Sequence, residues 1–125
     1  MTTTQATPRT PVPARCSFLR TALALQALTI FVQAVSAGLL LGTEYGEILH
    51  SVGARVMYGA SMLYLLAAVL AWKPGGGSPR AVGYASGFLV LASVQVVSGI
   101  AHLSALHVPL GVLMFGASLV AVVRR

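Results

Sequence analysis

The stretch Val32-Gln33-Ala34-Val35-Ser36 decides the fold, because it returns later in the chain as Val94-Gln95-Val96-Val97-Ser98. A second stretch also returns: Leu49-His50, followed by Met57-Tyr58-Gly59-Ala60-Ser61, recurs as Leu106-His107, followed by Met114-Phe115-Gly116-Ala117-Ser118. In both copies methionine follows histidine by seven residues, nearly two helical turns, so the two side chains share one helix face. The repeat predicts two equivalent helical hairpins whose histidines face each other across an approximate two-fold axis.

The composition is that of a membrane protein. Of the 125 residues, 57% are hydrophobic and only 8% are charged, whereas a soluble domain carries about 25% charged residues. Four apolar runs cover residues 21–41, 48–72, 81–100 and 106–123, and each matches the roughly 17–25 residues of a membrane-spanning helix. Because the connections are short, we expect one all-α domain, a transmembrane four-helix bundle running up, down, up and down.

Basic residues gather on one predicted side of the membrane. Arginine or lysine precedes the first run, lies between the second and third, and ends the chain, and only Arg55 stands elsewhere. The positive-inside rule therefore predicts that both termini face the cytoplasm, while Glu44, Glu47 and the three histidines lie on the outer side. The net charge is +6, but the basic residues do not form one face with interleaved aromatic residues. We therefore expect the lipid bilayer and no nucleic acid as a partner.

Residues 1–20 are expected to form a disordered basic cytoplasmic tail, ahead of a transmembrane domain of residues 21–125, because threonine and proline are frequent at the start of the chain. The segment Val35-Ser36-Ala37 is similar to a signal-peptide cleavage site. Cleavage there would remove most of the first span and break the repeat, so we expect the span to be retained. Cys16 has no second cysteine for a disulfide or a metal-thiolate site.

Polar and small residues indicate how the helices should meet. Gln26 and Gln33 are seven residues apart and should face the bundle interior, since amides in hydrocarbon need partners. Glycines four residues apart favour close helix approach; the pairs are Gly38 with Gly42 and Gly83 with Gly87. Thr43 and Ser104 are the expected caps of the second and fourth helices. Glu44 and Glu47 are expected in the first turn of the second helix, where the helix dipole favours acids.

The two histidines form the candidate site. Two imidazoles at matching depth on facing helices can hold a metal at the centre of a planar ring, with metal–nitrogen bonds of about 2.0–2.1 Å and nitrogens about 4 Å apart. Ala54 and Gly111 are small residues four positions beyond each histidine and should leave room for a flat ring. The pattern predicts one b-type haem whose iron is bound by His50 and His107.

The same repeat predicts the lining of this site. Met57 and Met114 should lie below the histidines, and Gln33 and Gln95 are candidate hydrogen-bond donors to the ligands. Methionine and aromatic stripes at helical spacing are nevertheless more often plain core.

Two further charged residues lie near His50 in the sequence. Arg55 is rotated away from the histidine face; it either reaches the outer headgroups, pairs with Glu44 or Glu47, or meets an acidic group of the cofactor. A bare metal ion is less favoured than haem, because two imidazoles fill only half of a tetrahedral shell and Glu47 is the one further candidate ligand.

The spacing Glu47-x-x-His50, with His107 and the two glutamine stripes, carries a family resemblance. The chain resembles one half of a haem A synthase, a four-helix unit in which Glu-x-x-His opens the second helix and another His opens the fourth. It is also similar to small bacterial four-helix membrane proteins with histidine at these two places. The resemblance implies that His50 and His107 ligate haem, that Glu47 lies near the porphyrin edge, and that the chain belongs to a bacterial cell membrane.

The expected role is electron transfer, haem handling or redox sensing, with a quinone, an external donor or a partner subunit exchanging electrons. No residue is a candidate for catalysis. The main alternative is a membrane scaffold or a subunit of a homo- or hetero-oligomer, without cofactor, in which the repeat is a duplicated packing unit. A small transporter or channel half is a third alternative, favoured by Arg55 and the parallel repeat.

Overall fold

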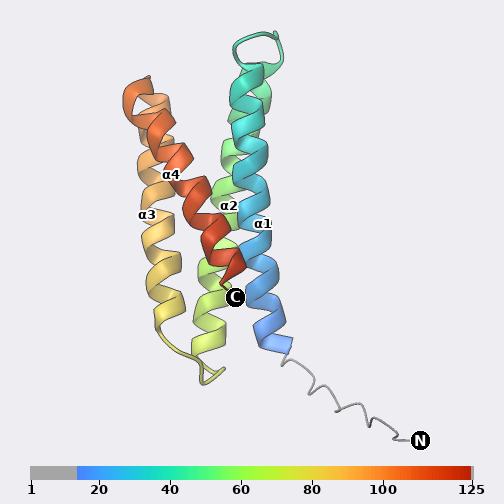
Figure 1. The fold of residues 1–125 in the computed structure, drawn as a ribbon, viewed down its shortest axis with the longest axis vertical. Helices are drawn as coiled ribbons and strands as arrows, with labels where there is room; N and C mark the ends of the chain where they lie inside the picture. Colours follow the sequence, from blue (N-terminus) through green and yellow to red (C-terminus); the bar gives the residue numbers. More distant parts are fainter. Residues whose placement is uncertain (1–13, 125) are drawn as a thin grey trace, which may run out of the picture.

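The computed structural model describes residues 14–124 and contains four helices: α1 (Ala14–Leu39), α2 (Gly46–Trp72), α3 (Arg80–Ile100) and α4 (Ser104–Val123) (Figure 1). The described residues contain no strand, so the predicted all-α four-helix architecture is confirmed. The largest difference lies at the start of α1, which begins at Ala14 rather than at residue 21. The rest of the expected tail, residues 1–13, lies outside the described part of the chain.

All four helices are long and apolar enough to cross a membrane, which makes the chain a multi-pass integral membrane protein. Most of their large hydrophobic side chains are exposed on the outside of the bundle, and α4 is the least buried helix. In water such a surface would be unfavourable, whereas lipid tails solvate it well. The bundle therefore buries little apolar surface and presents the remainder to the bilayer.

The helices form a ring in which each packs against two neighbours. Helix α1 packs against α2 and α4, and α3 packs against the same two helices, so the diagonal pairs do not pack within residues 14–124. Figure 1 shows α4 starting beside α3 and crossing towards the α1–α2 hairpin. The turns at 40–45 and 101–103 lie apart at one end of the molecule, here called the outer end (Figure 1). The two hairpins therefore diverge towards the outer end.

Two separate groups of buried apolar residues form the core. The inner cluster consists of Leu19, Ala22, Leu23, Tyr64, Ala67, Ala68, Ala81 and Ala85. The outer cluster consists of Ile30, Met57, Ala92 and Met114. Alanine dominates the inner cluster, which lets α1 and α3 each approach α2 closely at the end where the hairpins converge.

The glycine pairs do not make the helix contacts that we predicted. A Cβ atom added at Gly38, Gly42, Gly83 or Gly87 would meet nothing within 4 Å, so no neighbouring helix lies against these residues. The helices instead meet through alanines, and Ala68 and Ala85 are completely buried. Composition alone could not distinguish a small residue that faces a neighbour from one that faces lipid.

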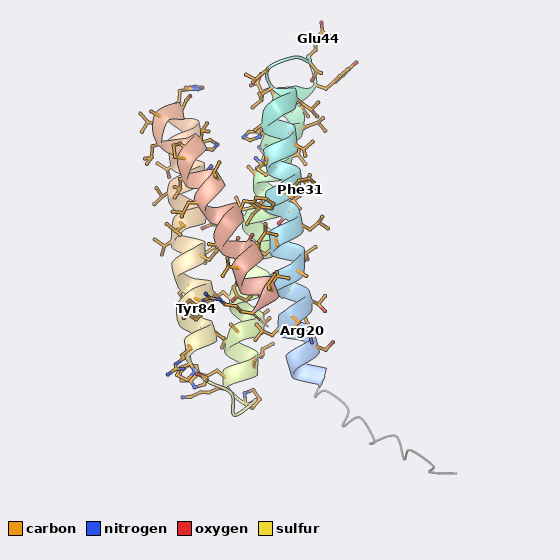
Figure 2. The ribbon with its side chains drawn as sticks, viewed as in Figure 1. Arg20, Phe31, Glu44 and Tyr84 are labelled. Atoms are coloured by element: carbon orange, nitrogen blue, oxygen red, sulfur yellow. The ribbon has the colours of Figure 1, made fainter. Side chains whose placement is uncertain are left out.

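The predicted helix caps were also wrong. Thr43 Oγ1 donates a hydrogen bond to the Leu39 carbonyl at 3.0 Å, so it closes α1 instead of starting α2. Helices α2 and α4 are preceded by Tyr45 and Leu103, and neither residue makes a side-chain cap hydrogen bond. Glu47 lies in the first turn of α2 as expected, but Glu44 belongs to the preceding turn and points away from the bundle (Figure 2).

Candidate histidine-pair site

His50 and His107 face each other near the outer end of the bundle. Their ring centroids are 6.0 Å apart and the ring planes are inclined by 68°, so the predicted facing of the two histidines is confirmed. Each lies within the first two turns of its helix, α2 or α4, and each side chain is half-buried. Because the backbones of α2 and α4 do not pack against each other, the two imidazoles meet across the diagonal of the bundle.

In the first hairpin, polar side chains of α1 hold the first turns of α2. Gln33 Nε2 donates a hydrogen bond to the His50 carbonyl at 2.9 Å and lies 3.2 and 3.3 Å from the two ring nitrogens. Ser36 Oγ donates to the Gln33 carbonyl at 2.9 Å and lies 3.1 Å from His50 Nδ1. Since the Ser36 proton is used towards the carbonyl, its oxygen is free to accept from Nδ1–H.

The second hairpin repeats these contacts with equivalent residues. Gln95 Nε2 donates to the His107 carbonyl at 2.9 Å, and Ser98 Oγ donates to the Gln95 carbonyl at 2.9 Å. His107 Nδ1 lies 2.9 Å from the Gln95 carbonyl oxygen. A carbonyl oxygen can only accept, so Nδ1 carries the proton and, in the neutral ring, Nε2 keeps its lone pair. The sequence repeat is therefore also a repeat of hydrogen bonds.

Glycines next to the glutamines make these contacts possible. A Cβ atom at Gly53 would collide with Gln33 Oε1, and one at Gly111 would lie 3.0 Å from Gln95 Nε2. We expected the space beside Gly111 to remain open for a flat ring. The Gln95 side chain occupies it instead. In the first copy the glutamine side chain faces Gly53, one residue before Ala54, which is the sequence equivalent of Gly111.

The methionines lie below the histidines, as predicted, in the outer cluster. Met57 and Met114 are 3% and 1% exposed, and Tyr58 and Phe115 pack against the same cluster. They close the inner side of the site with apolar atoms. Their sulfurs are core atoms, in agreement with the alternative interpretation of the methionine stripe.

Two contacts between the hairpins at this level were not foreseen. The Tyr58 hydroxyl on α2 lies 3.1 Å from Ser93 Oγ on α3. The Phe31 and Phe115 rings of α1 and α4 have centroids 5.9 Å apart. These contacts are equivalent in the repeat, since Ser93 follows Phe31 by the same 62 residues that separate Gln33 from Gln95. Extending the repeat to non-identical residues shows that the two contacts are equivalent, but not that they form.

Other residues discussed in the sequence analysis take no part in the hydrogen bonds between glutamine, serine and histidine. Glu47, Arg55 and His102 are exposed, and His102 occupies the outer turn with a φ of 55°. Among residues 14–124, no group of three or more histidine, cysteine, aspartate or glutamate side chains could hold a metal ion. Glu47 and Arg55 as neighbours of a cofactor therefore remain predictions.

One polar atom of the site has no partner within the described residues. Gln95 Oε1 is buried and accepts no hydrogen bond, whereas Gln33 Oε1 lies 3.4 Å from Ser36 Oγ. An unsatisfied buried oxygen costs free energy and marks the place where a donor would be favoured.

Comparison with known proteins assigns neither the fold nor the site, because the chain matches no family model, no curated protein and no solved structure.

Proposed function

We propose that the chain binds one b-type haem between His50 and His107 and serves in electron transfer, haem handling or redox sensing. The supporting observation is the spacing of the two rings. Axial bonds of about 2.0–2.1 Å place the ligating nitrogens about 4 Å apart, and about 1 Å more on each side for the ring radius places the centroids about 6 Å apart. The observed separation is 6.0 Å.

The donor set of the two rings agrees with this proposal. Histidines that bind a metal usually donate their other ring N–H to a carbonyl, carboxylate or water, which fixes ring orientation and increases ligand basicity. His107 Nδ1 donates to the Gln95 carbonyl, and His50 Nδ1 lies in reach of Ser36 Oγ. In the second hairpin Nε2 of His107 is thereby the nitrogen that is available for a metal. In the first hairpin the Gln33 amide lies 3.3 Å from His50 Nε2 and would have to turn away for this nitrogen to bind a metal.

Within the proposal, each residue has a defined task. Haem supplies one-electron redox chemistry when bound. His50 and His107 hold the iron, Gln33 and Gln95 fix the helix turns that carry them, and the outer cluster excludes water from the inner side. Glu47 near the porphyrin edge follows from the resemblance to the haem A synthase unit. Electrons are exchanged with a quinone, an external donor or a partner subunit.

We place the protein in a bacterial cell membrane with both termini in the cytoplasm. Arg20 and Glu44 lie at opposite ends of the molecule (Figure 2). Lys73, Arg80 and Arg124 flank the helix ends on the Arg20 side, and the positive-inside rule assigns that side to the cytoplasm.

Optical spectroscopy of the purified protein tests the haem proposal. Protein produced with a sufficient haem supply should show a Soret band, and His50→Ala and His107→Ala should each reduce it strongly. His102→Ala is the matched control, because this exposed histidine lies in the outer turn and should leave the band unchanged. A folded protein that stays colourless after haem is added would contradict the proposal.

A structural role without cofactor is the second candidate, and the glutamine contacts favour it. Each glutamine amide bonds the histidine carbonyl of the next helix, as expected of polar residues that join transmembrane helices. In this case the His→Ala variants would change stability and association but no spectrum.

A further inference from the structure

Gln26 is the most deeply buried polar residue in the described part of the chain, with an exposed fraction of 0%. Neither its amide nitrogen nor its amide oxygen has a hydrogen-bond partner among the described residues. Its place in the repeat is taken by Phe88 in α3, 62 residues later. The polar group is therefore specific to one hairpin and is not part of the duplicated histidine site.

Two buried serines lie at the same depth as Gln26. Gln26 is seven residues from Gln33, about 10.5 Å further towards the inner end at 1.5 Å per residue. Gly53, which contacts Gln33, is eight residues from Ser61, about 12 Å along α2. Ser118 is equivalent to Ser61 in α4, and both serines are 1% exposed. Three helices thus contribute polar side chains at one level.

This polar layer separates the two apolar clusters. On α1, Gln26 stands between Leu23 of the inner cluster and Ile30 of the outer cluster. On α2, Ser61 stands between Met57 and Tyr64 of the same two clusters. The core of the bundle is therefore interrupted near its middle by groups that form hydrogen bonds.

Each serine hydroxyl already donates its proton within its own helix, so it can only accept a further hydrogen bond. Ser61 Oγ donates to the Met57 carbonyl at 3.0 Å, and Ser118 Oγ donates to the Phe115 carbonyl at 2.7 Å. Their oxygen lone pairs remain, while the Gln26 amide offers two N–H groups and one oxygen. A water molecule accepts from N–H and donates to two oxygens, so it complements this set.

We propose that Gln26 binds water in the middle of the bundle, at a site shared with Ser61 and Ser118. Buried amides in native proteins are bonded either to protein or to ordered water, and a buried water needs two to four polar partners. The layer supplies such partners from three helices. Because the exposed fraction of Gln26 is 0%, the surrounding side chains leave no room there for a quinone or another lipid-soluble molecule.

Radiolytic oxidation of methionine tests this site. Brief X-ray exposure of the full-length protein in lipid nanodiscs generates hydroxyl radicals from water, including bound water, and mass spectrometry measures oxidation at each methionine. Met57 Sδ lies 3.8 Å from Ser61 Oγ, so radicals formed at the proposed site should reach it. We expect Gln26→Leu to lower the Met57 oxidation rate at least about three-fold, because the buried water loses its main partner.

Met62 is the internal control, since this methionine is 55% exposed on the same helix and should be oxidised at the same rate in both proteins. If Gln26→Leu does not fold, Ser61→Ala, which removes one acceptor, should lower the Met57 rate in the same direction. An unchanged Met57 rate would overturn the proposal. A raised Tm of Gln26→Leu would also overturn it. Replacing an amide that is bonded to water removes hydrogen bonds and lowers the Tm, whereas replacing an unpaired buried amide stabilises the protein.

Discussion

The two hairpins share one set of hydrogen bonds from side chains to backbone carbonyls but differ around the histidine rings. In both, a glutamine amide donates to a histidine carbonyl and a serine hydroxyl donates to the glutamine carbonyl. Nδ1 of each ring lies near a serine hydroxyl, at 3.1 Å for His50 and 3.4 Å for His107. The His107 ring also reaches the Gln95 carbonyl, whereas the His50 ring lies against the Gln33 amide. Duplication has kept the contacts that fix the helices and has let the ring environment diverge.

A single side chain accounts for part of this difference. Gly99 lies 62 residues after Ala37 and is its equivalent in the repeat. A Cβ atom at Gly99 would lie 3.0 Å from His107 Cε1, so the missing methyl group lets this imidazole approach α3. In the first hairpin the Ala37 methyl group is present. The His107 ring therefore has space against α3 that the Ala37 methyl group occupies at the equivalent place on α1.

The largest effect is expected when the glycines beside the glutamines are replaced. Gly53→Ala places a methyl group against the end of the Gln33 side chain, which must turn away and lose its bond to the His50 carbonyl. The helix preference of alanine offsets part of this cost, so we expect a net loss of about 2 kcal/mol in the free energy of unfolding. Gly111→Ala should stay within about 1 kcal/mol of the native protein, because its contact is longer and alanine favours the helix. Denaturation by SDS in mixed micelles, followed by circular dichroism, measures both. Equal losses would contradict the difference in packing between the hairpins.

Replacing the glutamines should also destabilise the first hairpin more than the second. Gln33→Leu removes the bond to the His50 carbonyl and should cost about 1–2 kcal/mol. Gln95→Leu removes the equivalent bond but also the unpartnered Oε1 atom, so the two effects offset each other and stability should change by less than about 1 kcal/mol. The same SDS titration compares the two variants. A greater loss for Gln95→Leu would show that Oε1 is bonded in the membrane.

The residues beside the two imidazoles, Ala37 and Gly99, can be exchanged by substitution. Gly99→Ala should push the His107 ring away from the Gln95 carbonyl, at a cost of about 1 kcal/mol, and lower the fraction of the ring protonated on Nδ1. Nitrogen NMR of ¹⁵N-histidine protein measures this fraction for each ring. Ala37→Gly is the reciprocal variant and should raise the Nδ1–H fraction of His50. If neither substitution changes the tautomer, the methyl group does not control ring position.

The smallest effect is expected at the contacts between the hairpins. Tyr58→Phe removes the hydroxyl that meets Ser93 and should cost about 0.5–1 kcal/mol. Phe115→Tyr, the matched change in the other hairpin, places a hydroxyl next to Phe31 without a partner and should cost at least as much. Thermal unfolding in detergent compares these variants with the native protein. A stabilised Tyr58→Phe variant would indicate that the hydroxyl pair is not formed.

Much of the fold could be predicted before any contact was known. The apolar runs determine four spans because only helices of this length satisfy their backbone hydrogen bonds in a bilayer. The repeat of His50 and Met57 as His107 and Met114 predicted that the two rings face each other and that the two methionines lie below them. The glycine pairs and the caps were wrong because helix periodicity defines a face but not what lies against it.

The sequence by itself determined the four spans, the duplicated hairpin and the depth of the two histidines, since all three follow from apolar length and helical spacing. The tertiary structure alone decided that His107 Nδ1 meets the Gln95 carbonyl, that Gly53 rather than Ala54 faces a glutamine, and that Tyr58 meets Ser93 while Phe31 meets Phe115. Those features depend on the rotation and crossing of helices about one another. Such relations arise from side-chain packing between helices, which the pattern along a single helix does not encode.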